Sequence, residues 1–182
     1  MVKIVKTPTV QSLGAAALHY LERYAASEAS LRRVLVNRIR RAALSHAAFA
    51  ADDARQEELY RAIEVLVGKY KKMGVINDAA FAEMKVGSLR RQGKSRRAIV
   101  QKLAQQGVAE RHVRQALAEK EEALAPDEGD LQAARVLAKR RRLGVFRTKP
   151  CCDDAARKDL AALARAGFSL DVARRALAGE ED

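Results

Sequence analysis

A run of cations in the middle of the chain is the feature of the sequence that most directly suggests chemistry. Between positions 85 and 114 there are nine lysines or arginines and a single acid, Glu110. Cations at this density are typical of a surface that attracts an anionic partner by charge. A second basic run occupies positions 139–142. The residues we expect to contact such a partner are Arg90, Arg91, Lys94, Arg96, Arg97, Lys102, Arg114, Lys139, Arg140, Arg141 and Arg142.

Covalent or metal chemistry is not indicated. Gly93, Lys94 and Ser95 resemble the end of a phosphate-binding loop, but that motif requires a glycine at position 88, where the chain has Ser88. The three histidines are scattered, and adjacent Cys151 and Cys152 have no partner at the spacing of a metal site. We therefore expect no enzyme activity, no catalytic residues, no metal and no cofactor.

A helix-turn-helix that reads DNA is the main alternative. Positions 99–116 have the required layout, with Gly107 at the turn and Val113 in the second helix. The usual motif has a small residue four positions before the glycine, because its two helices cross closely. Leu103 occupies that position here, which favours a structural use of the motif, and a transcriptional regulator stays the alternative hypothesis.

Composition limits the fold class. The chain has 182 residues, of which 48% are hydrophobic but only 4% aromatic, so alanine, leucine and valine must build the core. Alanine and leucine are strong helix formers, and runs of β-branched residues between turn signals are absent. We predict an all-α protein. The net charge of +12 indicates an anionic partner, and the lack of a signal peptide or a long apolar run predicts a cytoplasmic protein without a membrane partner.

The cationic stretch should form three short helices. Gly74, Gly93 and Gly107 each follow a helix end, where a left-handed residue closes the helix. Asn77 or Asp78 can cap the first helix and Ser95 the second. Each helix has an apolar stripe, and these stripes comprise Phe81, Ala82, Val86 and Leu89, then Ile99, Val100 and Leu103, then Val113, Ala116 and Leu117. Because the stripes use other residues, the cations at 90–102 are expected to face solvent.

Similar patterns precede and follow this stretch. A first helix is expected near 10–26, and its apolar side comprises Leu13, Ala17, Tyr20, Leu21 and Tyr24. Two more helices are expected from Ser27 through Ile39 and near 54–72, with 42–53 either a spacer or an extension of the preceding helix. Gly107 and Gly167 have the same surroundings, since each has a leucine four positions before it and Ala-Leu nine and ten positions after it. We predict three tandem three-helix repeats at 8–73, 74–122 and 131–179, with an insertion at 42–53 and an acidic linker at 123–130. Such stacked units predict an elongated monomer.

The central and closing motifs carry a family resemblance. The pattern G-x-x-[ND]-D-x-x-F-A at positions 74–82 is followed by R-x-x-G-K-x-x-R-x-I and then by L-x-x-x-G-V. Together with LARAGFSLDVARRAL at 163–177, it resembles the RecX regulatory proteins over about residues 12–178. Three departures from the family pattern, Ile76, Gln106 and Ala173, concern packing and one surface charge.

The resemblance implies a non-catalytic modulator of the RecA recombinase. It would bind the filament that RecA forms on single-stranded DNA and restrain its ATPase activity and strand exchange. The basic residues given above would contact the filament. Single-stranded DNA alone should bind weakly, because few aromatic residues are present to stack on bases. It should bind without sequence preference, because charge contacts with its backbone must dominate.

Overall fold

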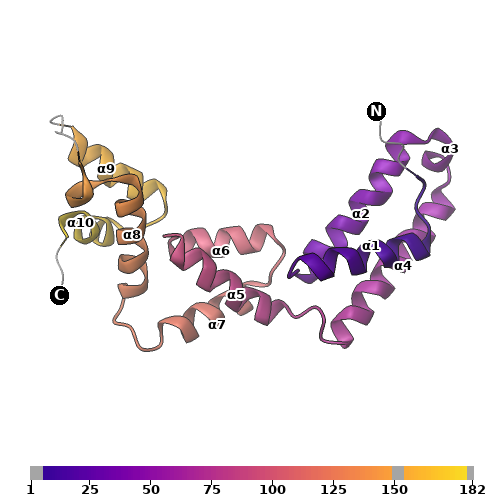
Figure 1. Ribbon diagram of the computed structural model, residues 1–182, viewed down its shortest axis with the longest axis horizontal. Coiled ribbons are helices and arrows are strands. Elements are labelled where there is room, and N and C mark those ends of the chain that lie inside the picture. The colour runs from indigo at the N-terminus through magenta and orange to yellow at the C-terminus, as the bar shows by residue number, and fades with distance from the viewer. Residues whose placement is uncertain (1–5, 149–153, 180–182) are drawn as a thin grey trace. The chain divides into compact units, whose positions relative to one another are not determined.

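The computed structural model describes residues 6–148 and 154–179, and it confirms the all-α prediction, since these residues form helices joined by turns with no strand among them (Figure 1). None of these helices has the length and apolar character needed to cross a membrane. The chain divides into two compact units. The first contains residues 1–81 and 106–108, and the second contains residues 82–105 and 109–182.

The first compact unit is built on α1 (Val10–Arg23), α2 (Glu28–Ser45), the short α3 (Ala47–Ala50) and α4 (Asp53–Lys72). Helix α1 packs on both α2 and α4, which also pack on each other. The core consists of side chains at helical spacing that are fully buried or nearly so, including Leu13, Ala17, Leu31, Leu35, Ile39, Leu59, Ile63 and Val67. Burying each of the larger of these side chains contributes roughly 1.5–3 kcal/mol.

The boundaries of two expected helices differ from the sequence prediction. Helix α1 ends at Arg23 rather than near residue 26, and Tyr24, expected on its apolar side, adopts an extended conformation and is 58% exposed. Its ring lies 5.4 Å from that of Tyr20. In the segment 42–53, residues 42–45 lengthen α2 as one of the two expectations had it, whereas residues 47–50 form a short helix of their own, α3, which the sequence analysis did not predict.

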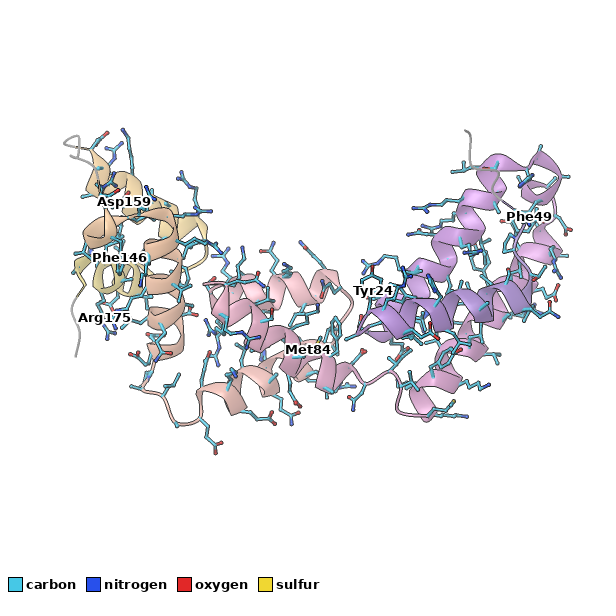
Figure 2. The ribbon with its side chains drawn as sticks, viewed as in Figure 1. Tyr24, Phe49, Met84, Phe146, Asp159 and Arg175 are labelled. Atoms are coloured by element: carbon cyan, nitrogen blue, oxygen red, sulfur yellow. The ribbon has the colours of Figure 1, made fainter. Side chains whose placement is uncertain are left out.

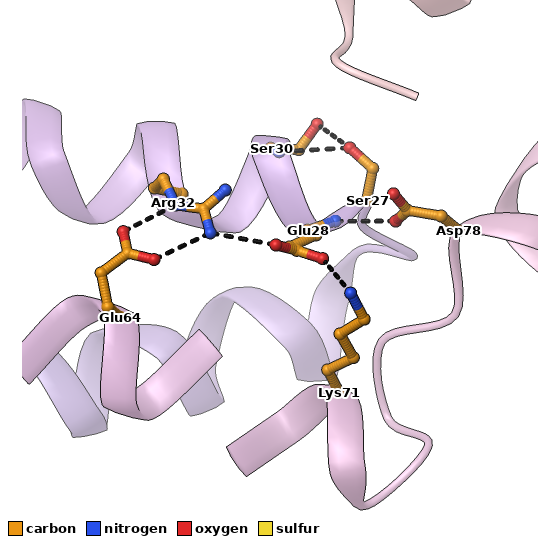
Figure 3. Close-up of polar contacts among 7 residues, drawn as sticks. All are labelled: Ser27, Glu28, Ser30, Arg32, Glu64, Lys71 and Asp78. Carbon is orange, nitrogen blue, oxygen red and sulfur yellow. Dashed lines mark hydrogen bonds and ion pairs between the residues drawn. The ribbon is translucent and has the colours of Figure 1, made fainter. Parts of the chain in front are cut away.

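Glu28, in the first turn of α2, is the centre of a polar network in this unit (Figure 3). Its carboxylate accepts hydrogen bonds from Lys71 at 2.8 Å and from Arg32 at 3.0 Å, while Arg32 also binds Glu64. These bonds join α2 to α4. Hydrogen bonding to Lys71 and then to Arg32 lowers the pKa of Glu28, and bonding to Arg32 lowers the pKa of Glu64.

The first unit should therefore lose stability in acid. A carboxyl group whose pKa is lowered by folding stabilises the native state above its unfolded pKa of about 4.3, and this stability is lost as the pH falls through the folded pKa. We expect Glu28→Gln to be less stable than the natural chain at pH 7 and to lose less stability between about pH 5 and pH 3. Urea unfolding at several pH values measures this. An equal loss in Glu28→Gln and in the natural chain would contradict it, and Glu22→Gln, at an exposed position of α1, is the control.

The second compact unit takes most of α5 (Asp78–Arg91), then α6 (Arg96–Gln105), α7 (Glu110–Glu121), α8 (Glu128–Arg141), the 3-10 turn η1 (Gly144–Phe146), α9 (Ala155–Arg165) and α10 (Leu170–Ala178). The apolar stripes predicted for α5, α6 and α7 are buried, except that Val100 is half-buried. Helix α10 packs on α8 and α9, around a core that includes Leu131, Leu137, Leu163 and Phe168.

The predicted helix ends are also confirmed. Gly74, Gly93 and Gly107 have φ angles of 72°, 73° and 75°, in the left-handed region. Ser95 caps α6 by accepting the N–H of Ala98 at 3.2 Å. Asn77 caps α5 by accepting the N–H groups of Ala79 and Ala80.

A buried carboxylate organises the last part of the second unit. Asp159 of α9, labelled in Figure 2, is 5% exposed, and it accepts hydrogen bonds from the N–H of Gly144 at 2.8 Å and from Arg147. These bonds hold η1 and the residue after it against α9. Cys151 and Cys152 lie outside the described residues.

The same pair of hydrogen bonds occurs once in each compact unit. In the first unit Ser27, the cap of α2, donates to the carbonyl of Gln106 at 3.0 Å, and Asp78 accepts the N–H of Glu28 at 2.9 Å. In the second unit Ser95, the cap of α6, donates to the carbonyl of Ala166 at 2.7 Å, and Asp130 accepts the N–H of Arg96 at 2.8 Å. The two accepting carbonyls directly precede Gly107 and Gly167, the glycines around which the sequence repeats.

Candidate functional site

Most of the predicted contact residues are exposed, and several lie at helix ends of the second unit. Arg91 ends α5, Arg96, Arg97 and Lys102 lie on α6, and Arg114 lies on α7. Residues 139–141 form the exposed end of α8. Arg142 follows as its C-cap in the left-handed conformation, with φ of 55°.

The structure brings three of these cations together. Arg96, Arg97 and Arg114 line one open groove between α6 and α7, beside the hydrocarbon groups of Val100 and Leu117. The side chain of Arg96 is 56% exposed and that of Arg114 is 74% exposed. Arg114 pairs with Glu110 at 2.7 Å, across one helical turn. We call Arg96, Arg97 and Arg114 the groove arginines.

Arg96 and Arg97 do not stabilise the helix that carries them. They occupy the first turn of α6, which contains no acidic residue. The backbone N–H groups at a helix N-terminus give that end a partial positive charge, so cations there are unfavourable and an anion is favourable. Asp130 and Ser95 already accept N–H groups at this helix end, so an anionic partner in the groove would interact mainly with the two guanidinium groups.

Arg90 is a correction to the sequence-based expectation that the cations at 90–102 face solvent. Its side chain is only 10% exposed and forms ion pairs with Glu121 and Asp130. It also donates to the carbonyl of Lys94 at 3.1 Å. Burial of a guanidinium is tolerated here because two carboxylates and a carbonyl surround it. Arg90 is thus placed to support the segment 94–97.

The acidic segment after α7 takes part in the packing. Only residues 122–127 connect α7 to α8, because Glu128 and Asp130 belong to the first turn of α8, where acids interact favourably with the helix dipole. Glu121 also lies 3.5 Å from Arg96. Although Glu110 is the single acid between positions 85 and 114, acids from further along the chain therefore neutralise Arg90 and in part Arg96.

The backbone that carries Arg96 and Arg97 is held at several points. Asp130 and Ser95 bind the start of α6 as described above. Gly93 packs directly on α8, where a Cβ atom would lie 2.8 Å from the nitrogen of Leu137 and 2.9 Å from the carbonyl oxygen of Ala133. Lys94 is half-buried in this segment. These contacts give the two arginines a fixed backbone from which to reach a partner.

Comparison with known proteins then identifies the family of the chain. A family model described as RecX, second three-helix domain, matches residues 77–117. A protein of Myxococcus xanthus named regulatory protein RecX is 42% identical over 163 residues, which is 89% of this chain and 82% of the relative. The chain belongs to the RecX family. A regulatory protein RecX of Thermobifida fusca is 32% identical over 81% of this chain and 76% of the relative. One of Agrobacterium fabrum is 35% identical over 57% of this chain and 52% of the relative. No solved structure matches the chain.

The groove arginines all lie inside the stretch that matches the second RecX domain, as do Arg90, Arg91, Lys94 and Lys102. The basic end of α8 lies outside it. Of the other predicted residues, Lys102 and the cations at 139–142 are exposed but do not line the groove. Arg91 lines a different cavity.

That cavity contains two residues that the sequence analysis did not identify, Gly87 and Lys120. Gly87 lies inside α5, four positions before Arg91, and Lys120 lies near the end of α7. A glycine inside a helix is unfavourable by about 1 kcal/mol relative to alanine. The glycine at position 87, within the helix predicted from the apolar stripe, could therefore have indicated from the sequence that this position has a special role. The pairing of α5 with the end of α7 could not be deduced from local spacing.

Proposed function

We propose that this RecX-family chain is a non-catalytic regulator that binds the filament of RecA on single-stranded DNA and restrains its ATPase activity and strand exchange. The observation that supports the proposal most strongly is the groove between α6 and α7, which Arg96, Arg97 and Arg114 line. All three arginines belong to the stretch of the chain that matches the second RecX domain. The names of the three relatives support a regulatory role.

The groove suits an extended anionic surface. Its cations are presented from two helices, and apolar side chains lie beside them, so an acidic protein segment or a phosphate backbone can be contacted without a deep pocket. A regulator that binds one state of a filament more tightly than another shifts the filament toward that state. Restraint of the ATPase thus requires no catalytic group on this chain.

Binding to the filament tests the proposal directly. The labelled chain is mixed with recombinase assembled on single-stranded DNA, and its anisotropy is compared with that in the presence of recombinase alone and of DNA alone. We expect the tightest binding to the assembled filament. Binding that is no tighter to the filament than to DNA alone would reject it.

DNA alone should bind the chain weakly and with strong salt dependence. If about six phosphates of a single strand are neutralised, the logarithm of affinity falls with the logarithm of salt concentration with a slope of roughly −4. Fluorescence titrations at several salt concentrations, with two unrelated oligonucleotide sequences, measure the slope and the sequence preference. Tight and sequence-selective binding to duplex DNA at physiological salt would instead support the transcriptional regulator.

A further inference from the structure

A second cavity in the second compact unit has the composition of a small-ligand site. It lies among α5, the end of α7 and α8, has a volume of about 490 Å³, and its apolar wall includes Leu124, Ala133 and Val136. The volume falls in the range of pockets that hold small molecules. Its cationic lining residues are Arg90, Arg91 and Lys120.

Two of these cations converge over Gly87. A Cβ atom placed on Gly87 would lie 3.5 Å from Nη1 of Arg91 and 3.7 Å from Nζ of Lys120. Both charged nitrogens are therefore close to one point at the floor of the cavity. Gly87 is buried in the interior of α5 and its φ angle is not in the left-handed region, so its backbone conformation does not require glycine. The missing side chain instead keeps the floor of the cavity open.

The carboxylate in the lining of the cavity is already engaged in ion pairs. Glu121 lines the cavity, but its oxygens face Arg90 and Arg96. Like charges brought together without an anion repel one another, and a bound anion would relieve this repulsion. Arg90 adds positive charge to the wall of the cavity, but its guanidinium is already paired with Glu121 and Asp130.

We propose that this cavity binds a phosphate-bearing small molecule of nucleotide size. The phosphate lies over Gly87 between Arg91 and Lys120, and the remainder of the molecule packs on Leu124 and Val136. A phosphate is favoured because its several oxygens can accept from two or three cationic groups at once. The site is distinct from the groove arginines, and it gives Arg91 a role other than the contact with the filament that the sequence analysis expected of it.

Gly87→Ala is the test variant, and Gly68→Ala, in α4 where nothing lies within 4 Å of the added methyl group, is its control. Alanine has the higher helix propensity, so both variants should melt a few degrees higher than the natural chain. Calorimetric titration of the whole chain uses pyrophosphate, ATP and adenosine as probes. We expect pyrophosphate and ATP to bind and adenosine not to bind. Gly87→Ala should weaken binding at least tenfold, and Gly68→Ala should leave it unchanged.

A charge variant makes the test independent of the added methyl group. Lys120→Gln should also weaken pyrophosphate binding at least tenfold, while Arg38→Gln, at an exposed position of α2, should not. Absence of saturable binding of both phosphate probes at millimolar concentration would overturn the proposal. So would equal binding to the natural chain and to Gly87→Ala. Because no recombinase is present, neither result bears on the proposed regulation of the filament.

Discussion

Replacing the three groove arginines with glutamine is expected to raise by roughly 30-fold the concentration of the chain needed for half-maximal inhibition of the recombinase. Each exposed ionic contact contributes about 1 kcal/mol or less, so three contacts to one partner amount to about 2 kcal/mol. The substitutions should leave the fold intact, because these side chains are exposed, and Asp130 binds Arg96 through its backbone N–H, which glutamine keeps. The 3.5 Å contact of the Arg96 side chain with Glu121 is lost, but Glu121 retains its ion pair with Arg90. Titration of filament ATPase activity with each variant measures the change.

A matched control separates a specific surface from net charge. Glutamine at positions 38, 40 and 41 removes the same three charges from the exposed side of α2. This control should inhibit nearly as well as the natural chain. Unchanged inhibition by the groove variant, with normal melting, would show that the groove is an ordinary solvated face, and residues 139–142 would become the leading candidates.

Arg90→Glu is expected to destabilise the second compact unit by at least about 3 kcal/mol. Removing one partner of a buried ion pair typically costs 3–5 kcal/mol, because the remaining charges stay buried without compensation. Here the substitution would place a third carboxylate beside Glu121 and Asp130, whose side chains are 18% and 19% exposed. The carbonyl of Lys94 would also lose its donor. Urea unfolding followed by circular dichroism measures the loss.

Arg91→Glu is the neighbouring control, because Arg91 is exposed on the same helix. Exposed substitutions of this kind usually change stability by about 0.5 kcal/mol or less. Equal stability of the two variants would mean that the ion pairs of Arg90 with Glu121 and Asp130 do not stabilise the second unit. If Arg90→Glu were then also a weaker inhibitor of the recombinase, Arg90 would have to contact the partner directly.

Local features of the fold could be predicted because their causes are local. Helical spacing of apolar residues identified the buried stripes of α5 and α7, and the glycines at 74, 93 and 107 have the left-handed conformation that closes a helix. The caps at Ser27 and Ser95 also follow from residue type and position. Tyr24 was misplaced because the helix ends one residue before it, which the periodicity does not reveal.

The roles of individual cations could not be predicted in the same way. Arg90 and Arg91 are adjacent and chemically identical, yet one is buried between Glu121 and Asp130 and the other is exposed. Those acids lie 31 and 40 positions away along the chain. Only the packing of α5 against the end of α7 and the start of α8 brings them together. The same packing places Arg91 next to Lys120.

The ATPase rate of the cognate recombinase on single-stranded DNA, measured as this chain is added, tests the central claim most directly. The chain alone should hydrolyse no ATP. The rate of the filament should fall to a lower plateau as the chain saturates it, and the groove variant should shift this titration to higher concentration. A filament rate that does not change at saturating concentrations of the chain would contradict the proposed function.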